Sequence, residues 1–449
     1  MHFDTLVIGG GLCGALVADH LSRAGRRVLT FEAGPVPRRP LPGDYPCFLR
    51  ATKRLTAVDA SRWRYRAPRG YAWHRVRALG GRTLLWGGWM MRPRADYFRW
   101  RRALGAAWPR ELEQLAPWVA LAERRLHVMS GARGQVHRRL ATLGLDALVK
   151  REAVLRRGSR MLTAADLAWR RVRQATALSF ESSARGVAVR LADGTVLEAR
   201  KLVLAASPVE TARIIEASRG SRARARLPYA DHLLAGALCI VARQPARPHP
   251  VGRPDFSAVI APRPDADVRF TLEIRGPTPL EHLDPDDVAE LGFTARTAAT
   301  KSFYVVFAMG ETDPLRPRTV ELDARARDAL GRAIPRFVRC QHTDWENRLA
   351  KQMNTECTRI AELLGDGGAD VYCIYDANDF ASGGHETGTC LDLVDSDGRL
   401  REFPNVFVAD GAGVPGATDG HPSLTLAANA LRVAGSVLAN RRAPLRSSR

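Results

Sequence analysis

The segment from Thr5 to Glu32 constrains the fold more than any other part of this 449-residue chain. A short apolar run, Thr5-Leu6-Val7-Ile8, leads directly into Gly9-Gly10-Gly11-Leu12-Cys13-Gly14, which fits the pattern G-x-G-x-x-G with glycines at 9, 11 and 14. In that pattern the first glycine permits a tight turn and the second lets the backbone approach a pyrophosphate. The third lets the following helix pack on the strand. The segment therefore predicts the strand, turn and helix that begin a nucleotide-binding α/β fold.

The residues after the glycines complete this pattern. Segment 15–24 places apolar residues at helical spacing, and Gly25 follows it. Segment 27–32 predicts a second strand that ends in Glu32, about twenty residues after the glycines, where a carboxylate can accept hydrogen bonds from ribose hydroxyls. A tight turn that binds nothing would not need this acid. We therefore predict dinucleotide binding, although these residues alone do not distinguish FAD from NAD.

Length and composition are those of a globular protein with more than one core. A chain of 449 residues is too long for a single ordinary core, so we expect two packed domains. No apolar run approaches the length needed to span a bilayer, and we expect no secretory signal before the first strand. The seven cysteines are scattered and include no Cys-x-x-Cys pair. This pattern indicates reduced thiols in a cytoplasmic protein and argues against a zinc or iron–sulfur site.

The formal net charge of +21 concerns partners more than fold. Such a charge can attract a polyanion, either nucleic acid or an acidic carrier protein that delivers a substrate. The arginines are spread along the whole chain and far outnumber the lysines, so a compositional bias accounts for much of the charge. We expect no nucleic-acid partner and keep the acidic carrier protein as an open alternative.

A second glycine-rich segment, residues 76–88, carries the pairs Gly80-Gly81 and Gly87-Gly88 on either side of Trp86. Glycine pairs around an aromatic residue indicate backbone pressed against a planar ring system, although a buried aromatic turn has the same pattern. Further on, residues 201–207 predict a buried strand followed by a helix over 209–217. Residues 229–379 alternate strand-like runs with Pro-rich turns and include a predicted helix over 345–364.

Two histidines near the C-terminus lie in short polar motifs. His385 stands in Gly-Gly-His-Glu-Thr-Gly-Thr, and His421 in Asp-Gly-His-Pro-Ser-Leu-Thr; between them an apolar strand, 405–409, ends in Asp410. Histidine is the side chain whose unperturbed pKa lies nearest neutral pH, so it suits removal of a proton from an alcohol. A single histidine is more often structural, but two in these motifs favour a catalytic pair.

Together these segments resemble the glucose–methanol–choline (GMC) family of FAD oxidoreductases. The resemblance covers residues 4–126, 175–218 and 310–438. It rests on motifs that occur in family order: Gly80-Gly81, Asp96, Trp108-Pro109, residues 203–207 with Glu210-Thr211-Ala212-Arg213, His385-x-x-Gly388-Thr389, and Asn405 to Asp410 followed by His421-Pro422. Residues 83–86 resemble most the pyranose-oxidase-like branch. Several members of that branch attach the flavin to a histidine where Leu85 stands here, so the resemblance implies non-covalent FAD.

The resemblance implies an α/β (α+β) fold, with a Rossmann-like FAD-binding domain and an inserted substrate domain built on a mainly antiparallel sheet plus helices. The expected FAD-binding parts are residues 1–105, 175–228 and 380–449. Residues 106–174 would form a helical insert or lid, and residues 229–379 the substrate domain.

The resemblance also implies residue roles. Gly9, Gly11, Gly14 and Glu32 would hold the ADP half of FAD. Gly80, Gly81, Trp86 and Gly87 would pass over the isoalloxazine, and Asp410 would lie near the ribityl–pyrophosphate segment. His385 and His421 would stand in front of flavin N5; family members carry either His or Asn at the position of His421. No metal is implied.

The implied reaction is oxidation of an alcohol to a carbonyl, with hydride transfer to flavin N5. We expect His385 to accept the hydroxyl proton and His421 to hydrogen-bond the same oxygen. The expected substrate is a secondary alcohol on a sugar, a glycoside or a small natural product. Two alternatives stay open: a lyase or isomerase with a structural flavin, and a flavin-containing binding or scaffold protein.

Overall fold

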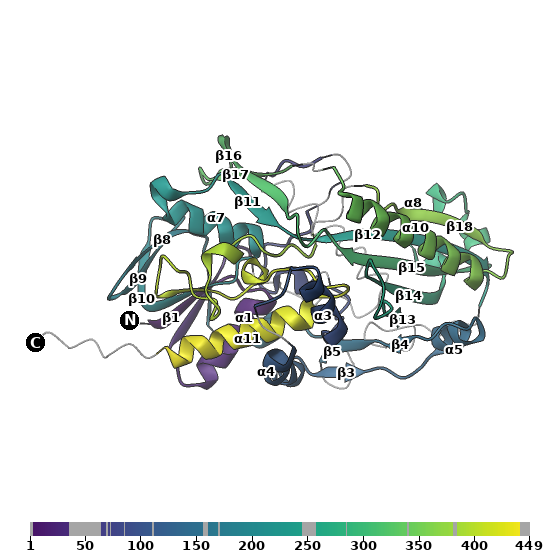
Figure 1. Ribbon diagram of the computed structural model, residues 1–449, viewed down its shortest axis with the longest axis horizontal. Coiled ribbons are helices and arrows are strands. Elements are labelled where there is room, and N and C mark those ends of the chain that lie inside the picture. The colour runs from purple at the N-terminus through teal and green to yellow at the C-terminus, as the bar shows by residue number, and fades with distance from the viewer. Residues whose placement is uncertain are drawn as a thin grey trace, which may run out of the picture.

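The computed structural model describes residues 3–35, 64–68, 71, 73–84, 86–109, 112–155, 160–168, 171–244, 257–283, 285–338, 341–379 and 384–440. Two lobes lie side by side along the long axis of the molecule (Figure 1). One lobe contains a largely parallel sheet together with the first strand and the last helix of the described chain. The other contains a long antiparallel sheet.

The first lobe is a largely parallel sheet with helices on both faces. Its strand order is β7 (Val172–Gln174), β2 (Val28–Glu32), β1 (Phe3–Ile8), β10 (Val196–Leu204), β9 (Gly186–Leu191) and β8 (Ala177–Ser183), with β19 (Val406–Val408) also paired to β10. The pairs β1–β2, β1–β10 and β10–β19 are parallel, whereas β8, β9 and β10 form an antiparallel meander.

Alternate residues of the central strands enter different cores. Val7 and Val203 pack with α1 (Leu12–Arg23) and α11 (Ser423–Ala439). Leu6 and Leu202 point to the opposite face, toward α7 (Pro208–Ser218). Because both faces are covered, these strands are almost continuously apolar, as strands of parallel sheets usually are.

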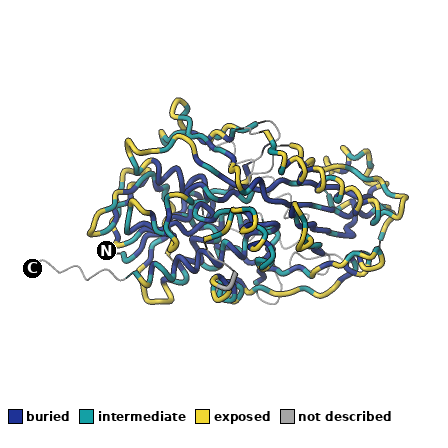
Figure 2. The backbone as a smooth tube through the Cα atoms, in the orientation of Figure 1, coloured by how far each residue is buried: buried dark blue, intermediate teal, exposed yellow. Residues whose placement is uncertain are grey.

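The second lobe is an antiparallel sheet covered by a long helix. The strand order is β18 (Asp370–Tyr375), β12 (His232–Ala242), β15 (Lys301–Glu311), β14 (Phe270–Pro279), β13 (Ser257–Ile260) and β4 (Leu148–Val149). Helix α10 (Asp344–Leu364) packs Leu349, Met353 and Ile360 against it. Figure 2 shows the buried strands of both lobes and the exposed loops around them.

The remaining elements connect and flank the two lobes. Two small sheets have the orders β11 (Arg226–Tyr229), β16 (Arg318–Arg327), β17 (Ala333–Phe337), and β3 (Val128–Ser130), β5 (Arg151–Leu155), β6 (Arg160–Met161). The other helices are α3 (Ala95–Ala103), α4 (Leu112–Arg125), α5 (Gln135–Thr142), α6 (Ala165–Ala168), α8 (Pro285–Glu290) and α9 (Ala295–Ala298). Short 3₁₀ turns cover Gly81–Leu84, Gly220–Arg222, Leu280–His282, Leu391–Leu393 and Gly411–Gly413.

The predicted fold class is confirmed: a Rossmann-like sheet is joined to a mainly antiparallel one. Within the described part of the chain, each helix is too short or too polar to cross a bilayer. The five cysteines that the structure describes, Cys13, Cys239, Cys357, Cys373 and Cys390, form no disulfide with one another.

Candidate active site

The glycine fingerprint forms the turn between β1 and α1, beside the end of β10. A Cβ atom on Gly9 would lie 2.2 Å from the Ala205 carbonyl oxygen, and one on Gly14 would lie 1.9 Å from the Gly9 carbonyl oxygen. Both glycines are therefore required by packing. A Cβ on Gly11 would meet nothing nearer than the Gly81 Cα atom at 4.0 Å. The backbone of Gly11 thus stays open to a close approach.

The second glycine pair packs directly on this turn, although the two lie about seventy residues apart in the sequence. The Gly80 N–H donates to the Gly10 carbonyl oxygen at 3.0 Å. A Cβ on Gly81 would lie 3.1 Å from the Gly11 Cα atom. Gly80 and Gly81 both have positive φ, +111° and +53°, which a residue with a Cβ rarely adopts. The predicted flavin loop and the predicted pyrophosphate turn therefore form one continuous surface.

Two carboxylates lie at the same edge of the sheet. Glu32 accepts hydrogen bonds from the Gly10 and Gly34 N–H groups, each at 2.9 Å, and retains further acceptor capacity for a ribose. Asp410 follows β19 and accepts from the Thr211 hydroxyl at 2.7 Å and from the Ala412 N–H at 3.0 Å. Burial raises the pKa of Asp410 to about 6.

This edge fits the phosphates of a dinucleotide. Parallel strands β1, β10 and β19 end here, and ligands of open α/β sheets bind outside the carboxyl ends of such strands. Helix α1 begins with Gly11 as its N-cap; none of the described side chains caps it, and its first turn contains no acid. Its first N–H groups and the positive end of its dipole can therefore take a pyrophosphate.

The rest of the predicted flavin loop packs on its own surroundings. The Trp86 indole N–H donates to the Leu162 carbonyl oxygen at 3.0 Å. A Cβ on Gly87 would lie 2.8 Å from the Trp89 indole, so Gly87 leaves room for that ring. The position of Trp86 and Gly87 over an isoalloxazine stays a prediction. Leu85, on which the expectation of non-covalent FAD depends, lies outside the described residues.

The structure brings the two predicted catalytic histidines together. Their ring centroids are 6.4 Å apart, with the planes at 80°. The His421 imidazole stacks on Trp89 at 4.5 Å and 13°, and its Nε2 lies 3.0 Å from a carboxylate oxygen of Glu273 on β14. Trp89 and Glu273 thus fix the plane and the rotation of the His421 ring.

His385 is held by a residue pair at the start of β12 that no sequence motif singles out. Its Nδ1 lies 2.8 Å from Nδ1 of His232, a fully buried imidazole. One oxygen of Asp231 accepts from the backbone N–H groups of both His385 and His232, at 3.1 and 2.8 Å. His232 and Glu273 come from strands of the second lobe and Asp231 directly precedes one of them, so only the tertiary fold reveals these residues.

Electrostatics distinguish the two histidines. Burial, followed by the neighbouring His232, His421 and Arg82, lowers the pKa of His385 well below its ordinary value. Burial also lowers the pKa of His421, but Glu273 opposes that shift. Burial alone would raise the pKa of Glu273; Arg275 and His421 outweigh it and lower that pKa to about 2. At neutral pH the site therefore combines a neutral His385 with an anionic Glu273.

Arg82 links the flavin loop to the His385 segment and was not predicted. Its guanidinium donates to the Ser207 hydroxyl at 2.5 Å and to the Gly384 carbonyl oxygen, and it lies 2.6 Å from the Glu386 carboxylate. Across the residue ranges given above, no set of three His, Cys, Asp or Glu side chains is arranged to hold a metal ion.

Comparisons with known proteins support an oxidoreductase that acts on CH–OH groups. Residues 311–430 match the family model described as GMC oxidoreductase, a family of flavoproteins. Paromamine 6'-oxidase from Streptomyces fradiae is 25% identical over 515 aligned positions, which cover 97% of this chain and 91% of that protein. The crystal structure of pyridoxine 4-oxidase from Mesorbium loti matches with a TM-score of 0.72 and 18% identity, over 98% of this chain and 100% of that one. The match of residues 311–430 to this family model agrees with the resemblance found in the sequence.

Proposed function

We propose that the protein binds FAD non-covalently and oxidises an alcohol of a sugar, glycoside or small natural product to a carbonyl, with His385 as the base. The observation that carries this proposal is the pairing of His385 with His421, whose ring centroids lie 6.4 Å apart, beside an edge that fits a dinucleotide. When bound, FAD supplies the hydride acceptor for the carbinol carbon.

His385 accepts the hydroxyl proton in this proposal. A base must be unprotonated before the reaction, and the lowered pKa of His385 keeps it so at neutral pH. General-base catalysis typically contributes about 10²- to 10⁴-fold in rate. The proton taken up is stabilised through the contact of His385 Nδ1 with His232.

His421 orients the same substrate oxygen. Its Nε2–H donates to Glu273, because a carboxylate of lowered pKa can only accept. Its Nδ1 then faces away from Glu273 and can hydrogen-bond the substrate. The Glu273 contact also favours a second assignment, in which His421 takes the proton and Glu273 stabilises the resulting imidazolium, as an acid does for the histidine of a catalytic triad.

Gly9, Gly11, Gly14 and Glu32 hold the ADP half of FAD in this proposal, with Gly80, Gly81, Trp86 and Gly87 along the isoalloxazine and Asp410 near the ribityl chain. The open backbone of Gly11 and the unused acceptor capacity of Glu32 support it. We also propose the domain division 1–105, 175–228 and 380–449 for FAD, 106–174 for the insert or lid and 229–379 for the substrate. The insert was expected to be helical, but besides α4, α5 and α6 it contains the short strands β3 to β7.

The substrate class is supported by the names of the relatives. One is an oxidase of paromamine and the other an oxidase of pyridoxine, both small molecules. The pyranose-oxidase-like branch and a cytoplasmic location remain proposals that rest on residues 83–86 and on the cysteine pattern. An acidic carrier protein is supported by the net charge of +21, and absence of retention on an immobilised acidic carrier would remove it.

The test is an absorbance spectrum of the purified protein, followed by anaerobic addition of sugars, glycosides and simple alcohols. We expect a flavin spectrum that one of these alcohols bleaches, and a flavin that acid releases. A flavin that stays with the denatured protein would contradict non-covalent binding. A flavin that turns over a substrate without ever being bleached would favour the lyase or isomerase alternative.

A further inference from the structure

Three hydrogen-bonding groups in a row determine which nitrogen of His385 carries its proton. The row runs from the Thr418 carbonyl oxygen to His232 and then to His385. The carbonyl oxygen lies 2.9 Å from His232 Nε2. A carbonyl can only accept, so the hydrogen in this bond belongs to His232 Nε2.

The hydrogen bond between His232 and His385 can then have its hydrogen in only one place, on His385. Burial lowers the pKa of His232 to about 4, so its imidazole is neutral near pH 7 and its Nδ1 is bare. His232 Nδ1 and His385 Nδ1 are 2.8 Å apart, and a hydrogen bond of that length needs one hydrogen. His385 Nδ1 must supply it. A neutral His385 therefore carries its proton on Nδ1 and has a lone pair on Nε2.

We propose that His232 is a positioning residue that holds His385 in the Nδ1–H tautomer, so that Nε2 is the nitrogen that takes the substrate proton. This inference rests on the proposed function, because it deepens the role of His385 as the base. The second ring nitrogen of a catalytic histidine commonly fixes its tautomer through the hydrogen bond that it makes. Here that partner is a second histidine.

The backbone around the row is held at both ends. Thr418 has φ +71°, a costly conformation for a β-branched residue, and its hydroxyl donates to the Gly420 carbonyl oxygen at 3.0 Å. The residue in this conformation is the one whose carbonyl oxygen accepts the hydrogen bond from His232. At the other end, Asp231 binds the backbone N–H groups of both histidines. The two rings meet edge to face, with centroids 4.9 Å apart and planes at 85°.

The same row supports His385 after it has taken a proton. The imidazolium of His385 continues to donate from Nδ1 to the bare Nδ1 of His232, and a hydrogen bond from a charged donor is about twice as strong as a neutral one. His421, Arg82 and His74 also act on His385 electrostatically. These groups are the same in every variant proposed below, so a comparison of variants isolates the effect of His232.

Two substitutions distinguish the effect of the hydrogen-bond acceptor at His232 from the effect of the side-chain volume. His232→Asn places an amide oxygen near the position of Nδ1 and can still accept from His385. His232→Phe fills a similar volume without an acceptor. We expect anaerobic flavin reduction to slow by between about 10-fold and 10⁴-fold in His232→Phe; the upper value is the loss seen when a triad histidine takes the wrong tautomer. His232→Asn should retain most of the wild-type rate.

The tautomer itself is measured by nitrogen NMR of the FAD-bound enzyme labelled with ¹⁵N-histidine. Protonated and bare ring nitrogens give separate signals, and the signals of His385 are those lost in His385→Ala. We expect a protonated Nδ1 and a bare Nε2 in the wild type and in His232→Asn, and a changed pattern in His232→Phe. The wild-type spectrum alone decides the tautomer if His232→Phe fails to fold.

A wild-type His385 protonated on Nε2 would overturn the inference. So would equal slowing of His232→Phe and His232→Asn with the His385 signals unchanged, because His232 would then act only through packing. Failure of the proposed function looks different. In that case His385→Ala reduces its flavin at the wild-type rate, whatever tautomer the spectrum shows.

Discussion

The contact between His421 and Glu273 places a buried, negatively charged carboxylate against one of the two histidines. Glu273 is almost completely buried, yet its pKa lies at about 2 because Arg275 and His421 stabilise the anion. We expect Glu273→Gln to slow flavin reduction by about 10- to 100-fold, since hydrogen bonds to charged groups contribute about 1.5–3 kcal/mol. Stopped-flow absorbance measures the rate.

Glu216→Gln is the matched control for that variant. Glu216 lies on α7 and is similarly buried, but it binds Arg219 and Arg224, which follow that helix, instead of a histidine. It should change stability without changing the rate of flavin reduction. Equal rates in wild type and Glu273→Gln would show that the charge of Glu273 does not act on the reaction.

Burial of His232 should make stability depend on pH. Its pKa is about 4 in the folded protein against 6.5 in the unfolded chain, so only the unfolded chain binds a proton between these values. Its contribution is fully present above pH 6.5 and is lost as pH falls toward 4, by about 3 kcal/mol in all. Asp410 acts in the opposite direction: its pKa is raised from 3.8 to about 6, so it adds stability as pH falls through 6.

The difference between wild type and His232→Asn isolates the histidine. Urea unfolding at pH 7 and at pH 4.5 should show the variant gaining about 2–3 kcal/mol relative to wild type at the lower pH. A difference that stays constant between the two pH values would mean that His232 takes up its proton at the same pH in the folded protein as in the unfolded chain.

Residue types and short motifs single out His385, His421 and Asp410 as candidates, because each lies in a motif of the C-terminal segment. They do not single out His232, Glu273 and Arg82. His232 and Glu273 lie in β12 and β14, whose sequences only indicate strands, and they reach the histidines through sheet pairing. Arg82 lies within the predicted flavin loop, but its partners Ser207 and Glu386 come from distant segments.

At the scale of single elements, the glycines of the turn between β1 and α1 have two different roles. Gly9 and Gly14 are needed for packing, whereas Gly11 leaves its backbone open to a ligand. Gly14→Ala should destabilise the protein and lower its flavin content together, because its Cβ would collide with the Gly9 carbonyl. Gly11→Ala should leave the far-UV circular dichroism unchanged but lower the ratio of flavin to protein, since Gly11 is where the backbone approaches the pyrophosphate.

Gly25→Ala is the control for these two variants. Gly25 ends the α1 region with φ +76° and has open space around it, so alanine there costs about 1 kcal/mol of backbone strain and should leave the flavin content unchanged. A normal flavin content in Gly11→Ala would contradict the placement of the pyrophosphate at Gly11.

Element boundaries show what local sequence can and cannot specify. The helix predicted over 345–364 is observed as Asp344–Leu364, because Thr343 and Glu346 form a capping box at its start. The strand predicted over 201–207 begins earlier, at Val196, since its first residues pair antiparallel with β9 before the strand joins β1. A capping box is local in sequence, whereas strand pairing is not.

At the scale of the whole molecule, a buried arginine ties the two lobes to the His421 segment. Arg269 directly precedes β14 and is fully buried. One nitrogen of its guanidinium lies 2.9 Å from a carboxylate oxygen of Asp96 and 2.9 Å from one of Asp419. Asp96 belongs to the motifs of the family resemblance, and this ion pair gives it a structural role in the first turn of α3. Arg269→Met should destabilise the protein by about 3–5 kcal/mol, because Asp419 is left buried without its partner.

Arg243→Met is the matched change at an exposed ion pair. Arg243 pairs with Glu281 on the surface, so its loss should cost less than about 1 kcal/mol. Denaturant unfolding of both variants measures the difference. Similar, small losses in the two variants would show that Arg269 does not hold the His421 segment in place.

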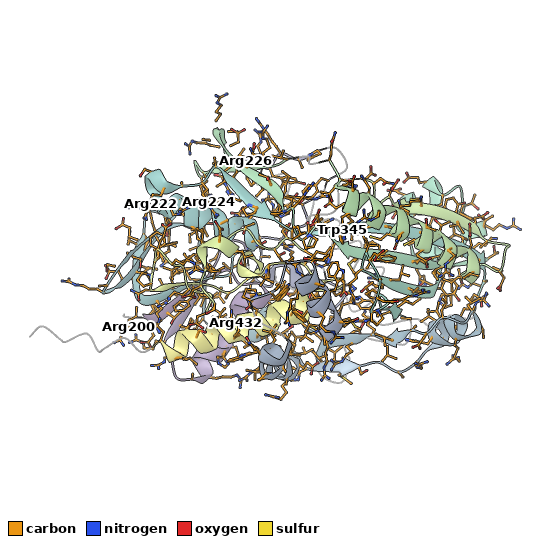
Figure 3. The ribbon with its side chains drawn as sticks, viewed as in Figure 1. Arg200, Arg222, Arg224, Arg226, Trp345 and Arg432 are labelled. Atoms are coloured by element: carbon orange, nitrogen blue, oxygen red, sulfur yellow. The ribbon has the colours of Figure 1, made fainter. Side chains whose placement is uncertain are left out.

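The arginine-rich surface is extensively ion-paired. Arg222, Arg224 and Arg226, which Figure 3 labels near α7 and β11, contact Glu402, Glu216 and Glu321 respectively. Their charges therefore contribute to the net value of +21 without forming a bare basic stripe at this position. The total charge could be counted from the sequence, but this pairing depends on the fold.

The most direct test of the central claim is the rate of anaerobic flavin bleaching in wild type and in His385→Ala, mixed with the same alcohol. We predict bleaching in the wild type and a rate about 10²- to 10⁴-fold lower in His385→Ala, with FAD still bound. Equal rates would contradict the assignment of His385 as the base. A colourless protein that cannot be reconstituted with FAD would contradict the account as a whole.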